Sequence, residues 1–519
     1  MNRDRAWDFV ALVAIALAFW WQLGSLPLTD VDEGAFSEAT REMVASGNYV
    51  SPQLDGEPRH DKPILIYWLQ AAGVHALGLS ELALRLPSAI AATLWALLLF
   101  HFVRRQADPD SARAAVLVMA LSVAVGFIAK AAIADALLNL WLAAAFFDIW
   151  RHAQSPSRAT LLRAYLWMGL GFLTKGPIAL ALPVAVSLAW FASAGRFRDW
   201  LRAAFAPAGW LVFLAVALPW HVAVYLDQGT AFFEGFYLHH NVGRYSDTME
   251  GHGGVLWYYL VWLPLILLPY PGLLAVTLAR LRPDWTDPLR RYLWIWFGTA
   301  FAVFSLSGTQ LPHYLLYGCT PLFVLMALHR DALRHRALAF APPIGALLLL
   351  LLLPELLTLA QDHTTRLYER ALIEAGLPLF DGTYRAAMAL GVAAVLGVAL
   401  ARRVPPFAGL VASGLVLAIA LWGFVLPRYL AVAQAPVREA AAIARTVGAP
   451  VVAYRAYLSS FSVYREAPTP QREPRPGEVV LTRVDRLASL ERLHPGVPKE
   501  VLYQRAGVVL LRLGAAPPS

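Results

Sequence analysis

The chain has 519 residues, of which 58% are hydrophobic and only 15% are charged. Soluble proteins carry about a quarter charged residues, so this composition excludes that class and predicts a polytopic membrane protein. The net charge of +8 does not indicate a nucleic-acid partner, because the basic residues lie in short clusters between apolar stretches, where membrane lipids are the expected neighbours.

Thirteen apolar stretches along the chain are candidates to cross a bilayer. Arginine clusters, such as Arg104 with Arg105 and Arg402 with Arg403, lie at alternate connections between them. By the positive-inside rule the amino end is then cytoplasmic and the carboxyl end lies outside. The single cysteine, Cys319, falls within a predicted span, which excludes an intrachain disulfide. The predicted spans are 7–26, 82–103, 112–128, 131–150, 160–174, 176–193, 205–226, 254–279, 291–307, 311–329, 337–360, 384–401 and 406–426.

The composition changes to that of a soluble protein after Pro427. We therefore predict an all-α polytopic membrane domain over 1–426 and a small extracytoplasmic α/β domain over 427–519. In the second domain, hydrophobic periodicity predicts a helix at 437–447 and strands at 451–454, 478–482 and 507–513. The membrane domain carries long outer-face loops at 27–81, 227–253 and 361–383, the last with a short surface helix at 364–375.

The first outer loop begins with a predicted helix. Asp32 and Glu33 precede residues with helical spacing, and Gly47 ends the pattern. Such a helix is expected to lie along the membrane surface, with its acids at the rim of a cavity. The alternative is that both acids only cap a surface helix.

The same loop ends with Asp61, Lys62 and Pro63. A proline at the first position of a second helix would leave free amides beside an ammonium group, an arrangement that suits a phosphate. The alternative for Lys62 is a side chain that extends from a helix end toward the membrane interface.

Two further ionisable residues lie near the outer ends of predicted spans. Asp135 follows Lys130 in IAKAAIADALLNLW. A carboxylate at that depth costs several kcal/mol unless it is paired or faces a wet cavity. Lys175, in FLTKGP, either serves function or anchors a helix end.

The second outer loop contains His239, His240 and Arg244. Adjacent histidines are not a metal site by themselves, and a metal would need Asp61 or another acid as partner. Arg244 suits bidentate contact with a phosphate. Tyr314, in TQLPHYLLYG, could donate its hydroxyl to a phosphate or belong to an interfacial aromatic belt.

These segments resemble a known family. The run DEGAFSEATREMVASGNYVSPQLDGEPRHDKPILIYWL is similar to the first periplasmic loop of the bacterial aminoarabinose transferases of lipid A. GFLTKGPIALALP, HHNVGRY and LPHYLL resemble further family segments in the expected order, so the similarity covers roughly residues 7–330. The wider superfamily comprises GT-C-type membrane glycosyltransferases that use polyprenyl-phosphate sugars, with the protein O-mannosyltransferases as relatives.

The resemblance implies roles for individual residues. Asp32 matches the acid at the catalytic centre, with Glu33 beside it. The groups that hold the donor's lipid phosphate correspond to Lys62, Arg244 and Tyr314.

Asp61 stands where the family has a glutamate that binds a divalent metal cation, and His239 or His240 would be its partner. Asp135 and Lys175 fall in matching segments, whereas Gln310 replaces the family's lysine before Leu-Pro.

The predicted function is transfer of a sugar, such as 4-amino-4-deoxy-L-arabinose, from undecaprenyl phosphate to lipid A or another acceptor at the outer face of the bacterial inner membrane. A lipid A phosphate would need no base, so Asp32 would orient it or stabilise positive charge; a hydroxyl acceptor would make Asp32 a general base. The alternatives are a protein O-mannosyltransferase-like or other lipid-linked-sugar transferase, and, in another class, a transporter or lipid flippase. The last class predicts ionisable groups near mid-membrane, whereas here they gather at one face.

Overall fold

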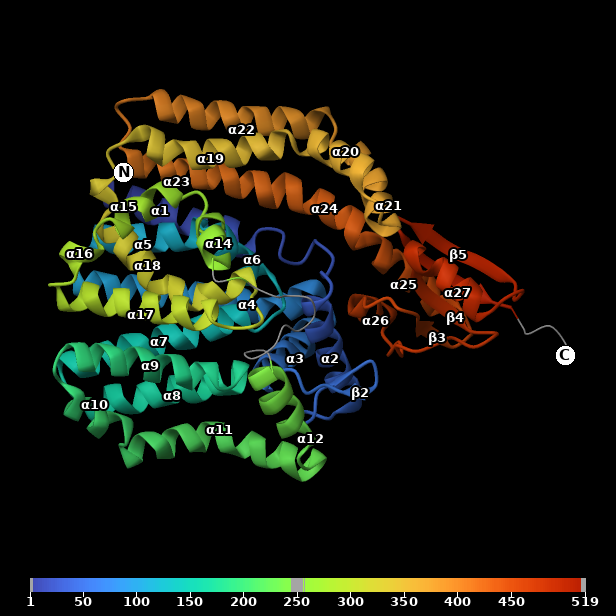
Figure 1. The fold of residues 1–519 in the computed structure, drawn as a ribbon, viewed down its shortest axis with the longest axis horizontal. Coiled ribbons are helices and arrows are strands. Elements are labelled where there is room, and N and C mark those ends of the chain that lie inside the picture. Colours follow the sequence, from blue (N-terminus) through green and yellow to red (C-terminus); the bar gives the residue numbers. More distant parts are fainter. Residues whose placement is uncertain (1–2, 244–254, 256, 515–519) are drawn as a thin grey trace.

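The computed structural model describes residues 3–243, 255 and 257–514, and of residues 241 and 242 only the backbone. A helical bundle forms one part, and a small sheet domain follows it near the carboxyl end (Figure 1). The bundle helices are α1 Arg3–Ile15, α4 Glu81–Gln106, α5 Pro109–Leu121, α6 Val123–Lys130, α7 Asp135–Gln154, α8 Arg158–Lys175, α9 Ile178–Ser193, α10 Phe197–Ala204, α11 Pro207–Gln228, α12 Ala231–Phe233, α14 Tyr258–Ile266, α15 Pro271–Leu278, α16 Leu281–Asp284, α17 Pro288–Ser305, α18 Cys319–Leu328, α19 Arg336–Leu351, α20 Leu353–His363, α21 Leu367–Gly376, α22 Gly382–Leu400, α23 Pro406–Ile419 and α24 Leu426–Ala433.

The helices confirm a mostly helical membrane protein. Within the described ranges, four helices are long and apolar enough to cross a bilayer singly: α4, α11, α22 and the continuous helix of residues 406–433. Two more pairs qualify together but bend sharply, α5 with α6 by 68° and α19 with α20 by 58°. Each predicted apolar stretch contains at least one helix of the structure. The number of thirteen crossings stays a prediction, as does the division at residue 427.

The first outer loop folds into two helices and a hairpin. These are α2 Asp32–Ser46, β1 Gln53–Leu54 paired with β2 Glu57–Pro58, and α3 Leu65–Leu77. Gly47 ends α2 as predicted, with a left-handed φ of 71°.

Helix α2 is covered by protein rather than exposed. Its residues from Glu33 to Met43 are buried, because α2 packs against α3 and against helix α26, Ser459–Arg465, of the carboxyl-terminal domain. Its position along the membrane surface stays a prediction. The expectation of a proline at the first position of the next helix is wrong. Pro63 precedes α3, which begins at Leu65 with Ile64 as its cap, so Asp61 and Lys62 lie in a loop.

The carboxyl-terminal domain is a four-stranded sheet with helices on both faces. Its strands are β3 Val451–Ala453, β4 Val479–Arg483, β5 Lys499–Arg505 and β6 Val508–Leu513, in the order β3-β4-β6-β5. Only β3 and β4 are parallel. Helices α25 Ala435–Thr446 and α26 pack on one face, and α27 Leu487–Leu493 on the other.

This sheet confirms the predicted α/β character, but sequence patterns missed β5. Its sequence KEVLYQR mixes charged and apolar residues, since it is an edge strand with solvent on one side.

Candidate functional site

One cavity at one end of the bundle collects five of the ten predicted site residues. Its volume is about 120 Å³. Lys62 reaches it from the first outer loop, Lys175 from the end of α8 and Tyr314 from the short 3₁₀ helix Pro312–Gly318. The other lining residues are Asp61, Ile178, Phe236, His240, Phe304, Ser307 and Tyr317. Three of the four residues predicted to hold a phosphate therefore line one cavity, while the fourth, Arg244, lies outside the described residues.

Asp61 lies between cationic side chains. Its Oδ1 accepts a hydrogen bond from Lys62 Nζ at 2.7 Å, and its Oδ2 accepts one from Arg59 Nη2 at 3.0 Å. His240 Nδ1 lies 3.5 Å from Asp61 Oδ1. The carboxylate thus holds Lys62 in place at the cavity and partly balances the local positive charge.

A second polar group surrounds Asp135, the first residue of α7. Lys175 Nζ donates to Asp135 Oδ1 at 2.9 Å and to Tyr317 Oη at 2.6 Å, and Tyr317 Oη donates to Asp135. His313 Nε2 lies 3.6 Å from the same carboxylate oxygen. The ammonium of Lys175 is also 5.1 Å from the ring centroid of Tyr314. Asp135 therefore orients Lys175 in the wall of the cavity, which supplies the pairing that a carboxylate at this depth requires.

The two acids at the start of α2 have different surroundings. Asp32 is exposed. Glu33 is only 2% exposed: its Oε1 accepts from Arg85 Nε at 2.6 Å and from Ala132 N at 2.9 Å. Burial opposes ionisation of Glu33, but Arg85 keeps its pKa below the ordinary value. Glu33 is thus paired inside the protein and does not line the cavity.

Asp32 and Asp61 both act on the charge of Arg59. Arg59 donates from Nε to Tyr67 Oη at 3.0 Å. Burial disfavours the charge on Arg59, yet its pKa is raised overall. The causes are Tyr67, Asp61 and, less strongly, Asp32. Arg59 thus interacts electrostatically with both carboxylates, and of these two acids only Asp61 lines the cavity.

Sequence reasoning missed three functional candidates: Arg59, His313 and Tyr317. Arg59 lies in the same EPRHDKP run as Asp61, and a second basic residue beside a lysine is a usable signal for an anion site. His313 and Tyr317 flank Tyr314, and only the turn of the 3₁₀ helix brings them to Asp135.

The two adjacent histidines also have different surroundings. His240 lines the cavity beside Asp61, whereas His239 is exposed. Among the described residues no third histidine, cysteine or acid joins Asp61 and His240 in a metal-binding group. Within the described ranges the donor set at this point is thus one carboxylate and one imidazole, and both carboxylate oxygens accept from cations.

A group of carboxylates that could hold a cation does occur elsewhere. It consists of Glu38, Glu42 and Asp55, whose oxygens lie within 4.8 Å of one another. Arg41 already pairs with Glu38 through two hydrogen bonds of 2.6 and 2.7 Å. This group lies between α2 and the carboxyl-terminal domain, where Ser462 donates to Asp55.

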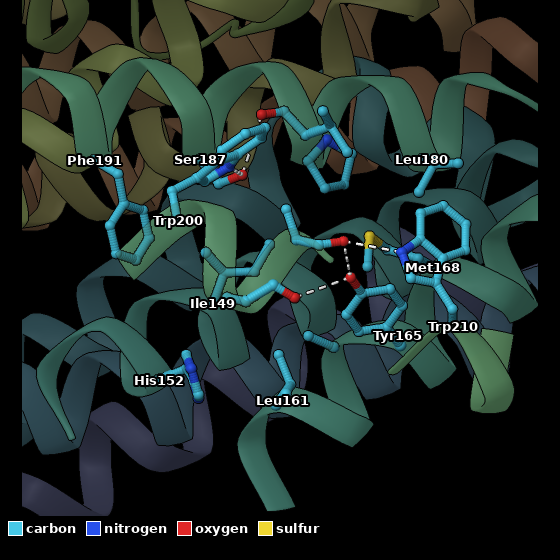
Figure 2. Close-up of a pocket in the computed structure, with 15 residues that line it drawn as sticks. Ile149, His152, Leu161, Tyr165, Met168, Leu180, Ser187, Phe191, Trp200 and Trp210 are labelled. Atoms are coloured by element: carbon cyan, nitrogen blue, oxygen red, sulfur yellow. Dashed lines mark hydrogen bonds between the residues drawn. The ribbon is translucent and has the colours of Figure 1, made fainter. Parts of the chain in front are cut away.

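A different cavity, of about 80 Å³, lies among α7 to α11 (Figure 2). Its wall is apolar and aromatic, with Tyr165, Trp200 and Trp210 among the lining residues. The hydroxyl of Tyr165 points at the backbone of α10 and donates to the carbonyl of Ala204 at 2.7 Å. None of the predicted site residues lines this cavity, so the polar cavity is the candidate site.

The known proteins that this chain resembles are sugar transferases. A sequence model of the family described as dolichyl-phosphate-mannose-protein mannosyltransferase matches residues 61–222. The undecaprenyl phosphate-alpha-4-amino-4-deoxy-L-arabinose arabinosyl transferase of Edwardsiella ictaluri is 32% identical over 336 residues, 63% of this chain and 60% of the relative. The transferase of the same name from Aeromonas hydrophila is 33% identical over 315 residues, 59% of this chain and 56% of the relative.

Solved structures extend the likeness to the whole fold. ArnT from Cupriavidus metallidurans, bound to undecaprenyl phosphate, superposes with a TM-score of 0.79 at 19% identity and 99% coverage of both chains. The oligosaccharyltransferase of Archaeoglobus fulgidus has a TM-score of 0.50 at 12% identity, over 90% of this chain and 64% of that chain. The chain is therefore similar in sequence to aminoarabinose transferases and has the same fold as ArnT. Its sequence match spans about 60% of the length of these curated relatives, and the ArnT comparison shows the fold alone.

Proposed function

We propose that this aminoarabinose transferase-like protein moves a sugar, 4-amino-4-deoxy-L-arabinose, from an undecaprenyl-phosphate donor to lipid A or another exposed acceptor. The observation that carries the proposal is the convergence of Lys62, Lys175 and Tyr314 on one cavity from three separate segments. Two ammonium groups and a phenol in one cavity suit a phosphate. The names of the relatives, which specify an undecaprenyl phosphate sugar, support the same donor.

The donor phosphate would lie between Lys62 and Lys175. Breaking the bond between sugar and phosphate leaves a phosphate anion, and charges fixed before the reaction stabilise that anion as it develops. Asp61 orients Lys62 and Asp135 orients Lys175, as their 2.7 and 2.9 Å hydrogen bonds support. Arg244, which follows His240 in the sequence of the same loop, is expected to be a further phosphate ligand.

Asp32 would act on the acceptor or on the anomeric carbon. Its exposed carboxylate forms no ion pair with a residue that the structure describes, in contrast to Glu33, which pairs with Arg85. With a lipid A phosphate as acceptor, Asp32 orients the acceptor or stabilises positive charge on the sugar. With a hydroxyl acceptor, it removes the proton as a general base.

A divalent cation is a further element of the proposal. Asp61 and His240 are the residues that would hold it, and His239 is too exposed to share that role. The cation would supply positive charge to the phosphate. Lys62 and Arg59 already place positive charge beside Asp61. We therefore expect the cation to assist sugar transfer but not to be required for it.

We place the site at the periplasmic face of the bacterial inner membrane. The arginine-bearing helices α10 and α16 lie at the end of the bundle opposite to α3, next to which Lys62 lines the cavity (Figure 1). The arginine-rich end is the cytoplasmic end by the positive-inside rule. An acceptor such as lipid A would then meet the donor outside the cytoplasm.

A second candidate is transfer of a mannose-type sugar to protein, because the matching family model describes protein mannosyltransferases. Both candidates share the donor phosphate site and differ in acceptor. The transporter or flippase alternative has less support, since the paired site residues Asp61, Lys62 and Lys175 gather at one end of the bundle.

The test is transfer by the purified full-length protein. Undecaprenyl-phosphate aminoarabinose would be offered with lipid A or with a peptide, and products would be identified by mass spectrometry. Modified lipid A supports the main proposal, and glycosylated peptide supports the second. Folded wild-type protein that transfers the sugar to neither acceptor would overturn the enzyme assignment, and Lys62→Met protein as active as wild type would overturn the phosphate site.

A further inference from the structure

The segment Leu28–Asp32 carries the proposed catalytic acid and is held from two sides. On the bundle side, Arg85 of α4 donates to the carbonyl oxygens of Leu26 at 2.7 Å and Pro27 at 2.8 Å. The same guanidinium pairs with Glu33 immediately after the segment. These bonds anchor the two ends of the segment and leave its centre to another partner.

That partner is the carboxyl-terminal domain. Helix α26 of this domain lies against α2 (Figure 1). Asp30 accepts from the backbone N of Ser460 at 2.9 Å and from its Oγ at 2.5 Å. Leu28 N donates to Tyr464 Oη at 2.7 Å, also from α26. Both bonds join residues more than 400 positions apart in the chain.

Gln434 completes the contact. In the amide orientation that matches its neighbours, its Nε2 donates to Asp30 Oδ2 and to Leu28 O, each at 3.1 Å. Its Oε1 accepts from Asp30 N, again at 3.1 Å. The backbone and the side chain of Asp30 are thus both bound by the region that follows the bundle, two residues before Asp32.

Gly34 shows that the fit is close. A Cβ atom at this position would lie 2.6 Å from Ser460 N and would also collide with Asp30 Oδ1. Backbone at that distance cannot give way as a flexible side chain can. The approach of α26 to the start of α2 therefore requires a glycine here.

We propose that Ser460 is a positioning residue for sugar transfer: through Asp30 it fixes the segment that carries Asp32, so that the carboxyl-terminal domain helps to hold the proposed catalytic acid in place. This inference rests on the proposed function of Asp32. The chemical reason is that loss of a donor leaves a partly buried carboxylate oxygen short of a hydrogen bond, and the segment then relaxes toward water. Small displacements of a reacting group lower rates strongly.

The test compares two serines on the same helix. Ser460→Ala removes the hydroxyl that binds Asp30. Ser462→Ala is the matched control, because its hydroxyl binds Asp55 and so also joins the two domains, but away from the segment. Gly34→Ala is a second perturbation, which pushes α26 away from Asp30 without changing Ser460.

Two measurements on the full-length protein decide the matter. The first is kcat and KM for the donor; we expect kcat to fall about 10-fold or more in Ser460→Ala and Gly34→Ala, with KM nearly constant, and neither to change in Ser462→Ala. The second is hydrogen exchange of the peptide covering 28–34, which should speed up in the first two variants only.

The outcomes separate this inference from the proposed function. Equal loss of kcat in Ser460→Ala and Ser462→Ala would show general domain docking and overturn it, as would unchanged kcat and exchange in Ser460→Ala. If the wild-type protein shows no transfer, the proposed function fails, and the exchange data alone decide whether Ser460 holds the segment.

Discussion

Adjacent residues can have opposite roles, as Asp32 and Glu33 show. Both open α2, yet only Asp32 reaches solvent, while Glu33 lies against Arg85. The direction of each side chain follows from the helix, since neighbours point about 100° apart. Only one acid of the pair can therefore meet a substrate.

Replacement of Asp32 by asparagine tests the catalytic role. Asparagine keeps the size and the helix-start preference of aspartate but removes the charge, so the free energy of unfolding should change by no more than about 1 kcal/mol. Sugar transfer should fall by roughly a hundredfold or more. Transfer would be measured in membranes and normalised to folded protein; near wild-type turnover would move the chemistry to Asp135.

Glu33→Gln, at the neighbouring position, should have the opposite effect to Asp32→Asn: it should lower stability and leave turnover nearly unchanged. It breaks a buried ion pair and leaves Arg85 without its carboxylate, which costs about 3–5 kcal/mol. Thermal unfolding in detergent should show a clear loss of stability, while turnover per folded molecule stays within a few-fold of wild type. A stable but inactive Glu33→Gln protein would contradict this assignment.

Asp30 predicts a pH dependence of stability. Loss of water around the carboxyl group raises its pKa to about 7, with smaller increases from Glu33 and Asp55 and opposing hydrogen bonds from Ser460. A raised pKa favours folding most below the unfolded value of 3.8, and this contribution is lost as the pH rises toward 7.

Wild-type stability relative to Asp30→Asn should therefore decline between pH 4 and about 8, by roughly 1 to 4 kcal/mol. Thermal unfolding of both proteins across this range measures the difference. A difference that is independent of pH would mean that Asp30 keeps its ordinary pKa.

At the scale of elements, three helical segments meet at Asp135. Lys175 ends α8, Tyr317 lies in the 3₁₀ helix before α18, and Asp135 starts α7. Their hydrogen bonds join these ends at the level of the cavity. The ion pair therefore contributes to packing and holds Lys175 at the proposed phosphate site.

A double-mutant cycle separates those two contributions. Asp135→Asn and Lys175→Met should each cost about 3–5 kcal/mol, since each leaves one buried charge without its partner. The double variant should lose less stability than the sum of the two, yet transfer should stay low because the phosphate has lost a cation. Additive losses in thermal unfolding would mean that the two side chains do not interact.

Local sequence patterns predicted where the helices lie better than they predicted which distant residues contact them. Hydropathy located the helices, and Gly47 located the end of α2, because both depend on short-range spacing. The resemblance pointed to Lys62 and Tyr314, which do line one cavity. The Glu33–Arg85 pair spans 52 residues and the Asp30–Ser460 contact 430. No local pattern encodes such pairings, and for this reason the packing of α2 against the carboxyl-terminal domain could not be predicted from the sequence.

At the scale of the whole molecule, contacts at the two ends of the first helical stretch show which segments share one end of the bundle. At its start, Asp8 of α1 pairs with Arg113 of α5. After its end, Asp30 accepts a hydrogen bond from Ser460 of the carboxyl-terminal domain. The first outer loop and the carboxyl-terminal domain must therefore lie on the same side of the membrane. α10 lies at the opposite end of the bundle from α21 and that domain (Figure 1).

Labelling of introduced cysteines tests this orientation. Arg366, before α21, and Arg202, in α10, have side chains that are 79% and 81% exposed. Each pairs only with an exposed acid, so a cysteine at either position should cost less than about 1 kcal/mol. A membrane-impermeant maleimide added to spheroplasts should label Arg366→Cys, and should label Arg202→Cys only after permeabilisation. The wild-type protein is the control, because its single cysteine, Cys319, is fully buried. The reverse labelling pattern would place the cavity in the cytoplasm, where an acceptor outside the cell membrane could not reach Asp32.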